Sequence, residues 1–260
     1  MLSKRIIPCL DVKEERTVKG VHFEDLQDVG DAVALGQHYA RTGADELVYL
    51  DISATREGRH TFTQLVSRIA DGINIPFTVG GGISTIDDAA RLLDAGADKV
   101  SINSAALRTP ELIDQIAARY GSQFVVVAID ARHQPLAPDQ AEADALWTVC
   151  THGGTQPTDR ELYSWAHEAQ ERGAGEILFT SMNHDGTKHG YPCTTYARLT
   201  AGLRIPVIAS GGAGSAHDIA EVLAKGHADA ALAASIFHYG EITIPELKQA
   251  LSHEGIPVRL

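Results

Sequence analysis

The sequence predicts an α/β fold, namely a (β/α)8 (TIM) barrel with a two-fold half-barrel repeat, over residues 1–260 as one domain. Three observations predict it. Short apolar runs alternate with amphipathic helical patterns from end to end. Eight such strand–helix pairs in about 250 residues match the size of this barrel. The chain also repeats itself at a nearly constant offset. A doubly wound parallel sheet is the alternative, although it usually has fewer strand–helix repeats over this length.

Eight segments are expected to form the barrel strands. Several are rich in β-branched residues and continuously apolar, as strands buried on both faces are. In chain order they are Arg5–Leu10, Glu46–Asp51, Phe77–Gly80, Lys99–Asn103, Phe124–Asp130, Glu176–Ser181, Val207–Ser210 and Ala230–Ala234.

Helical patterns lie between these strands, and Ser84, Thr109, Thr158 and Ser215 are plausible N-caps for them. In the pattern that begins at Thr85, residues such as Ile86, Ala89 and Leu93 mark one apolar face. The expected helices are Asp31–Thr42, Thr85–Ala95, Pro110–Tyr120, Arg160–Arg172, Ala216–Lys225 and Ile244–His253.

The internal repeat divides the chain into half-barrels of four βα units, at about residues 1–122 and 123–260. Ile75-Pro76 recurs as Ile205-Pro206, and Gly81-Gly82 recurs as Gly211-Gly212 at the same offset. The long connection Ala131–Pro157, which holds a strand-like stretch at Leu146–Cys150, follows the fifth strand. A long connection at that place is more often a functional loop than filler.

Composition excludes several classes of protein. With 22 Lys and Arg against 34 Asp and Glu, the formal net charge is −12, which argues against a nucleic-acid partner. No apolar run reaches the roughly 18 to 20 residues of a membrane span. Because the first residues lead straight into a strand-like run, we expect a cytoplasmic protein with no membrane partner. None of the 12 histidines stands in a metal-ligand spacing, so neither a metal nor another cofactor is expected.

Asp11 and Asp130 are the candidate catalytic residues. Each ends an apolar strand, and the two strands lie on opposite sides of the expected barrel mouth. Partial burial pushes the pKa of a carboxyl group toward values that suit proton transfer. The plainer alternative is that each aspartate caps a loop or holds a lysine. Asp51 also ends a strand, but a supporting role is as plausible for it.

Glycine clusters indicate two phosphate sites. Gly80-Gly81-Gly82 and Gly211-Gly212-Ala213-Gly214 each follow a strand and precede a helix. Glycine lets the backbone approach an anion closely, and a helix start presents N–H groups. Asn103-Ser104 and Ala234-Ser235 end the next strand in each half. Two symmetric sites suggest a substrate with a phosphate at each end, although glycine after a strand is common.

Four charged residues open strands at the opposite, N-terminal face of the barrel. They are Arg5, Glu46, Lys99 and Glu176, and their charges alternate in sign. Spacing alone leaves two interpretations open: separate solvated charges, or a ring of salt bridges that closes the barrel bottom.

Several motifs closely resemble the cyclase subunits of imidazole glycerol phosphate synthases. The resemblance covers nearly the whole chain and is carried by Lys4–Val12, Val18–Val21, Phe77–Ile83, Ile208–Gly214 and Leu232–His238. It implies a (β/α)8 barrel in histidine biosynthesis. In that family ammonia combines with a formimino-linked phosphoribulosyl aminoimidazole carboxamide ribonucleotide. The products are imidazole glycerol phosphate and aminoimidazole carboxamide ribonucleotide.

The resemblance also implies roles for individual residues. Asp11 and Asp130 match the two acid/base residues, and Lys19 matches a lysine on a flexible loop. One phosphate site corresponds to Gly82, Asn103 and Ser104, and the other to Asp185, Gly186, Gly212, Ala234 and Ser235. Thr180 and Ser210 line the pocket between them. Arg5, Glu46, Lys99 and Glu176 match an ammonia gate, so the implied partner is a glutaminase subunit docked at the N-terminal face as a heterodimer.

Some positions depart from the family pattern. His22 replaces a usual Asn, Asn183-His184 replace a frequent Asp-Arg, Pro192 replaces a common Asp, and Asp159 stands where Gly is frequent. Two competing functions stay open from the residues alone. One is the isomerase of the preceding pathway step, which needs no ammonia gate. The other is a non-catalytic barrel that binds a partner or a phosphorylated metabolite.

Overall fold

Eight parallel strands pair side by side and close into a barrel, which confirms the expected fold. The computed structural model describes residues 2–21, 24–52, 63–135 and 145–260. Strand β7 pairs with β10 and β12 pairs with β1, so the eight barrel strands form a closed ring. The barrel strands are β1 (Arg5–Lys13), β4 (Leu47–Asp51), β5 (Phe77–Gly80), β6 (Lys99–Ile102), β7 (Val125–His133), β10 (Glu176–Ser181), β11 (Val207–Ser210) and β12 (Ala230–Ala233).

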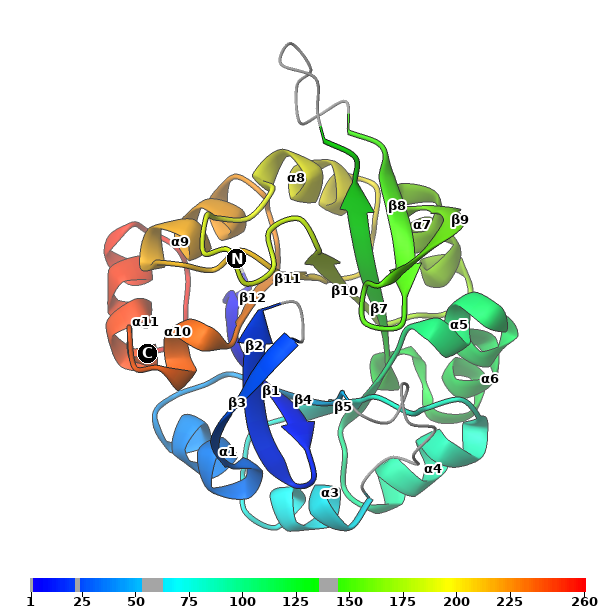
Figure 1. Ribbon diagram of the computed structural model, residues 1–260, viewed down its shortest axis with the longest axis horizontal. Coiled ribbons are helices and arrows are strands. Elements are labelled where there is room, and N and C mark those ends of the chain that lie inside the picture. The colour runs from blue at the N-terminus through cyan, green and yellow to red at the C-terminus, as the bar shows by residue number, and fades with distance from the viewer. Residues whose placement is uncertain (1, 22–23, 53–62, 136–144) are drawn as a thin grey trace.

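Helices surround the strands as an outer ring (Figure 1). The six expected helices are confirmed as α1 (Ala32–Arg41), α4 (Ile86–Asp94), α6 (Glu111–Tyr120), α7 (Leu162–Glu171), α9 (Ala216–Ala224) and α11 (Ile244–His253). The structure adds α3 (Thr63–Ala70), α8 (Cys193–Ala201), the short helices α5 (Ser104–Arg108) and α10 (Ser235–His238), and a 3-10 turn, η1 (Ser122–Phe124). The short helices α5 and α10 follow β6 and β12 directly, at the end of the barrel where the aspartates lie.

Only one of the four expected N-caps is confirmed, namely Ser215 on α9. Thr85 caps α4 in place of Ser84, because its side chain accepts from the Asp88 backbone in a capping box. Glu161 caps α7 in place of Thr158. Thr109 does not cap α6, which begins after Pro110.

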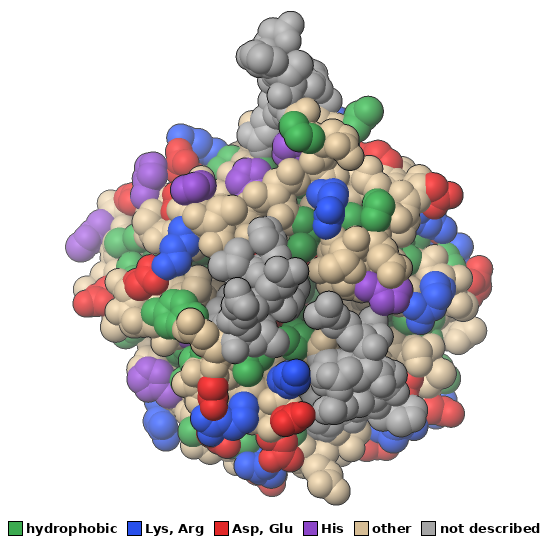
Figure 2. Space-filling view, viewed as in Figure 1, with side chains coloured by type: hydrophobic (Ala, Val, Ile, Leu, Met, Phe, Trp, Pro, Cys, Tyr) green, Lys and Arg blue, Asp and Glu red, His purple; other side chains and the backbone are tan. Residues whose placement is uncertain are grey.

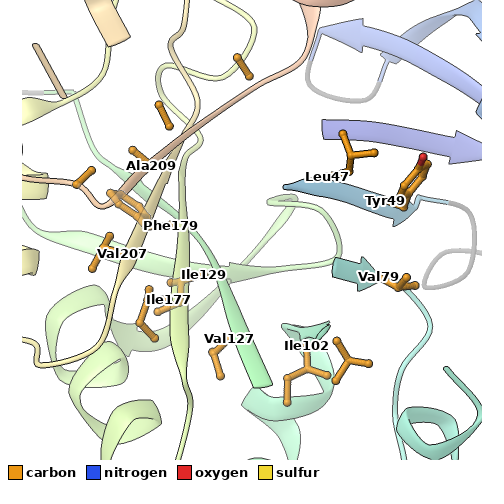
Figure 3. Close-up of a cluster of buried hydrophobic side chains, with 14 of the residues drawn as sticks. Leu47, Tyr49, Val79, Ile102, Val127, Ile129, Ile177, Phe179, Val207 and Ala209 are labelled. Carbon is orange, nitrogen blue, oxygen red and sulfur yellow. The ribbon is translucent and has the colours of Figure 1, made fainter. Parts of the chain in front are cut away.

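The hydrophobic core lies in two layers, one outside and one inside the barrel. Side chains that point outward form one cluster with side chains of the helices, and Leu47, Tyr49, Ile129 and Phe179 belong to it (Figure 3). A smaller cluster fills the barrel interior, because successive side chains of a strand point to opposite faces of the sheet. It consists of Ile7, Cys9, Val48, Val126, Leu178, Ile208, Ala230 and Leu232.

Two antiparallel hairpins extend the barrel at related places in its two halves. β2 (Arg16–Val21) and β3 (Glu24–Asp31) continue from β1, and β8 (Trp147–Thr151) and β9 (Gln156–Glu161) continue from β7. Both β1 and β7 are therefore longer than expected, with nine residues each. In each half of the barrel, the strand that carries the aspartate, Asp11 or Asp130, therefore pairs with an antiparallel hairpin.

No helix in the described part of the chain is both long enough and apolar enough to cross a membrane.

The turn between β1 and β2 contains a local strain that can be tested. Lys13 pairs with Arg16, and the two residues between them, Glu14 and Glu15, have φ values of 52° and 63°. Such a turn favours Asn-Gly, because most side chains are strained in this region. Glu14→Asn together with Glu15→Gly should therefore raise the free energy of unfolding by about 1 kcal/mol in urea denaturation.

The control is Arg68→Ala, because Glu15 also makes an exposed ion pair of 2.8 Å with Arg68. Such a pair contributes roughly 0 to 1 kcal/mol. If the double variant is less stable than Arg68→Ala, the account of the turn is wrong.

Candidate active site

One row of side chains on β1 runs through the barrel interior from end to end. Arg5, Ile7, Cys9 and Asp11 are alternate residues, so they share the inner face of the strand. Ile7 and Cys9 belong to the interior apolar cluster, which places Arg5 at one end of the barrel and Asp11 at the other. On β7 the same alternation places Val126, Ala128 and Asp130 inside. Both candidate aspartates therefore emerge at the C-terminal end of the interior.

Asp11 is held between two neighbouring strands. Its backbone is in register with Val18 of β2 on one side and Leu50 of β4 on the other, and the residue is only 3% exposed. Asp51, the weaker candidate, is in register with Val12, which belongs to the layer beneath the helices. Asp51 thus lies on a different face of the sheet from Asp11.

Asp130 has surroundings that change its acidity. Burial and the nearby negative charge of Asp185 raise its pKa to about 7. A hydrogen bond of 3.0 Å from Asn103 Nδ2 to Asp130 Oδ2 opposes the shift. The other amide atom of Asn103, Oδ1, is buried and accepts no hydrogen bond from any described residue. Asp130 can therefore both release and take up a proton near neutral pH.

The C-terminal ends of neighbouring strands bring further candidate residues beside Asp130. Thr180 on β10 is in register with Asp130 on one side and with Ser210 on β11 on the other. Asp185 reaches the same region from the segment that follows β10. The structure thus assembles Asn103, Asp130, Thr180, Ser210 and Asp185 in one area.

Close backbone packing explains several of the glycines in the glycine-rich loops. Gly81 and Gly211 have φ values of 95° and 85°, in a region that side chains rarely adopt. A Cβ atom on Gly81 would lie 2.2 Å from the Asp51 carbonyl oxygen, and one on Gly212 would lie 2.1 Å from that of Gly190. These glycines are therefore required by close contact with the neighbouring loops, whether or not an anion binds.

In α4 and α9, where we expect N–H groups to face phosphate, a cap engages one backbone N–H of each first turn, that of Asp88 and that of Asp218. Thr85 and Asp88 cap α4, and Ser215 accepts a hydrogen bond from the backbone N–H of Asp218 on α9. The short helices α5 and α10 differ, because their N-cap residues, Asn103 and Ala234, form no side-chain cap with any described residue. The two helices are related by the sequence repeat.

One contact at the α5 end could not be expected from the sequence. The backbone N–H of His152, in the turn between β8 and β9, donates to Ser104 Oγ over 3.2 Å. His152, Gly153 and Gly154 all have positive φ values, and the adjacent pair of glycines was the only local signal for this tight turn. Gly82 and Gly186 also have positive φ, while Ser235 begins α10. The side chain of Lys19 lies outside the described residues.

Four charged side chains form a closed ring at the N-terminal end of the interior. Arg5 lies 2.8 Å from Glu46 and 2.9 Å from Glu176, and Lys99 lies 3.0 Å from each of the same two glutamates. Thr78 donates a further hydrogen bond of 2.9 Å to Glu46. Burial opposes the charge of Arg5, but the two glutamates outweigh it and raise the pKa of Arg5 above its ordinary value. Each charge in the ring is thus neutralised by two neighbours.

Charged side chains of both signs are interspersed around the visible face of the molecule, with several histidines among them (Figure 2). The net negative charge is therefore not concentrated in the described part of that face. Among the described residues, no group of three or more His, Cys, Asp or Glu side chains is placed to hold a metal ion.

Comparisons with known proteins agree with this geometry. The family model "Histidine biosynthesis protein" matches residues 5–243. The chain is 58% identical over 260 residues to imidazole glycerol phosphate synthase subunit HisF of Phocaeicola vulgatus, and 58% identical over 259 residues to that of Bacteroides thetaiotaomicron. It is 55% identical over 260 residues to the same subunit of Flavobacterium johnsoniae. In all three cases the match covers 100% of both chains. The chain therefore belongs to the histidine biosynthesis protein family, within the group of imidazole glycerol phosphate synthase subunit HisF enzymes.

Proposed function

We propose that this chain is the cyclase that combines ammonia with the formimino-linked phosphoribulosyl aminoimidazole carboxamide ribonucleotide. The products would be imidazole glycerol phosphate and aminoimidazole carboxamide ribonucleotide. The observation that carries the proposal is the pair of carboxyl groups, Asp11 and Asp130, at the C-terminal ends of β1 and β7. These strands are related by the repeat, so the groups approach a bound substrate from two sides.

The reaction needs proton transfer at several steps. Ammonia condenses with the ribulosyl carbonyl group, the carboxamide ribonucleotide leaves, and the imidazole ring closes. A group with a pKa near the working pH transfers protons in both directions most effectively. Asp130, whose pKa is about 7, meets that condition. Asp11 serves the other side of the substrate, and the buried Asn103 Oδ1 is an available acceptor for a substrate hydroxyl or N–H.

The two phosphates of the substrate are assigned to the two rims of the barrel. One would bind at Gly82, Asn103 and Ser104, and the other at Asp185, Gly186, Gly212, Ala234 and Ser235, with Thr180 and Ser210 between them. The related positions of α5 and α10 support this assignment. Lys19 would add a positive charge from the β2 hairpin.

Ammonia would enter at the opposite end of the barrel. A glutaminase partner docked at the N-terminal face would release it beside the ring of Arg5, Glu46, Lys99 and Glu176. The ring consists of ion pairs between side chains, so it can open when one of them turns away. The apolar interior beyond it favours neutral ammonia over ammonium, because burial of an unpaired charge is costly.

Asp11→Asn and Asp130→Asn should each lower turnover with ammonium salt and the formimino substrate by roughly 10²- to 10⁴-fold, the usual range for loss of an acid/base group. The amide keeps the shape of the carboxyl group but cannot transfer a proton at neutral pH. The matched control is Asp87→Asn, an exposed aspartate on α4. Turnover close to that of the wild type in either site variant would overturn the assignment.

The raised pKa of Asp130 should also make the free energy of unfolding depend on pH. Between the ordinary aspartate pKa of 3.8 and about 7, the folded state holds a proton that the unfolded state releases. The stability of the wild type should therefore fall across that pH window relative to Asp130→Asn, by up to about 4 kcal/mol for about 3 pKa units. Urea denaturation of both proteins from pH 4 to 8 measures the difference. A difference that stays constant with pH would contradict the raised pKa.

Loss of one ring charge should affect delivery of ammonia. In Lys99→Ala, Glu46 and Glu176 each keep only Arg5 as a partner in the ring. With a glutaminase partner present, the ratio of imidazole glycerol phosphate formed to glutamine hydrolysed should fall at least several-fold. Lys225→Ala, which removes an exposed lysine at the C-cap of α9, is the control. An unchanged ratio in Lys99→Ala would exclude the gate.

A further inference from the structure

Beyond the end of β10, the pairing with β7 is continued by a side chain instead of by backbone groups. The parallel ladder of the two strands ends where Ser181 pairs with Ala131, and Met182 N then donates to Ala131 O over 2.9 Å. One residue later, Asn183 Oδ1 accepts from the backbone N–H of His133, and Asn183 Nδ2 donates to the carbonyl of the same residue, both over 3.0 Å. The Asn183 amide therefore continues the ladder by one further step.

The same segment also forms hydrogen bonds within itself. The backbone N–H groups of His184 and Asp185 both donate to Ser181 O, over 3.1 Å and 2.9 Å. His184 Nδ1 lies 2.7 Å from Ser181 Oγ. Asp185 therefore sits in a tight turn that is fixed at its base by Ser181 and at its side by Asn183.

The turn is joined to the strand that carries a candidate catalytic group. His133 is three residues beyond Asp130 on β7, so the Asn183 amide joins the Asp185 turn directly to the strand that carries Asp130. We propose that Asn183 is a positioning residue, whose two hydrogen bonds to His133 hold the Asp185 carboxylate beside Asp130. The inference rests on the proposed function only in assigning Asp130 to proton transfer.

An amide suits this role for a chemical reason. It donates and accepts at the same time, so it satisfies both backbone groups of His133, whereas a carboxylate only accepts and an alkyl side chain does neither. Asn183 is exposed, so its removal leaves no buried polar group unpaired. Substitutions at this position are therefore expected to leave the barrel folded.

Several groups share this environment. The groups facing Asp130 are Asp185, the Asn103 amide and the Cys150 thiol of β8, which lies beside Arg132. Asp185 also interacts with the Tyr196 hydroxyl of α8, which stays neutral because burial raises its pKa. Burial, together with His133 and His189, lowers the pKa of His184, so this ring is neutral at neutral pH. Asp185 is the negative charge among these that raises the pKa of Asp130.

The test is an NMR titration of the Asp130 carboxyl carbon in the free protein, with the signal assigned by its loss in Asp130→Asn. In Asn183→Ala the Asp185 turn loses its fixed place, so the pKa of Asp130 should fall by roughly 0.5 to 1 unit. Asn183→Gln, which keeps both a donor and an acceptor, should restore part of the shift. In the background of Asp185→Asn, Asn183→Ala should produce no further shift, because the charge it positions is gone.

Two results would overturn the inference. One is an unchanged pKa of Asp130 in Asn183→Ala. The other is an equal shift in the presence and absence of the Asp185 charge, which would show that Asn183 acts by another route. The pH profile of ammonium-dependent turnover, measured in parallel, should move in the same direction as the titration. If the carboxyl group titrates as expected but the turnover profile does not move, the positioning role stands and the acid/base role of Asp130 fails.

Discussion

The alternation of side chains along eight parallel strands is the constraint on which the rest of this molecule depends. Because every second residue points inward, a single strand such as β1 carries Arg5, Ile7, Cys9 and Asp11 in one row. Closure of the sheet brings the ends of such rows together. At one end they form the ring of four charges, at the other they form the cluster around the aspartates, and an apolar layer separates the two. The same burial that fills the interior also raises the pKa of Asp130.

The two halves share a plan but give their aspartates different surroundings. Asn103 and Ala234 occupy related positions before α5 and α10, beside β7 and β1. Asn103 donates to Asp130, whereas the methyl side chain of Ala234 can offer no such bond to Asp11. Opposite the aspartates, Cys150 on β8 takes the place that Val18 has on β2. A repeated half-barrel thus carries two identical side chains in different surroundings.

The sequence predicted the eight barrel strands and six of the helices, but it did not predict the β2–β3 hairpin or the amphipathic helix α3. The barrel strands were recognisable because they are short, apolar and β-rich, whereas β2 and β3 were not recognised because charged residues interrupt the apolar pattern of residues 16–31. The charged residues that open the strands could be recognised in the sequence. Which of them form ion pairs, however, depends on the stagger of the strands in the closed barrel. The pKa of Asp130 likewise depends on Asp185, which lies 55 positions away in the chain, and on Asn103. The hydrogen bonds of Asn183 to His133 leave no trace in a local pattern.

The central claim is that nitrogen travels through the barrel interior, from the charged ring to the aspartates. Isotope transfer tests it most directly. The chain and the proposed glutaminase partner are supplied with glutamine labelled with ¹⁵N in the amide group and with an excess of unlabelled ammonium salt. If ammonia passes inside the barrel, the imidazole glycerol phosphate formed from glutamine keeps the ¹⁵N label despite the external pool. Dilution of the label to the isotope ratio of the bulk ammonium would contradict the account.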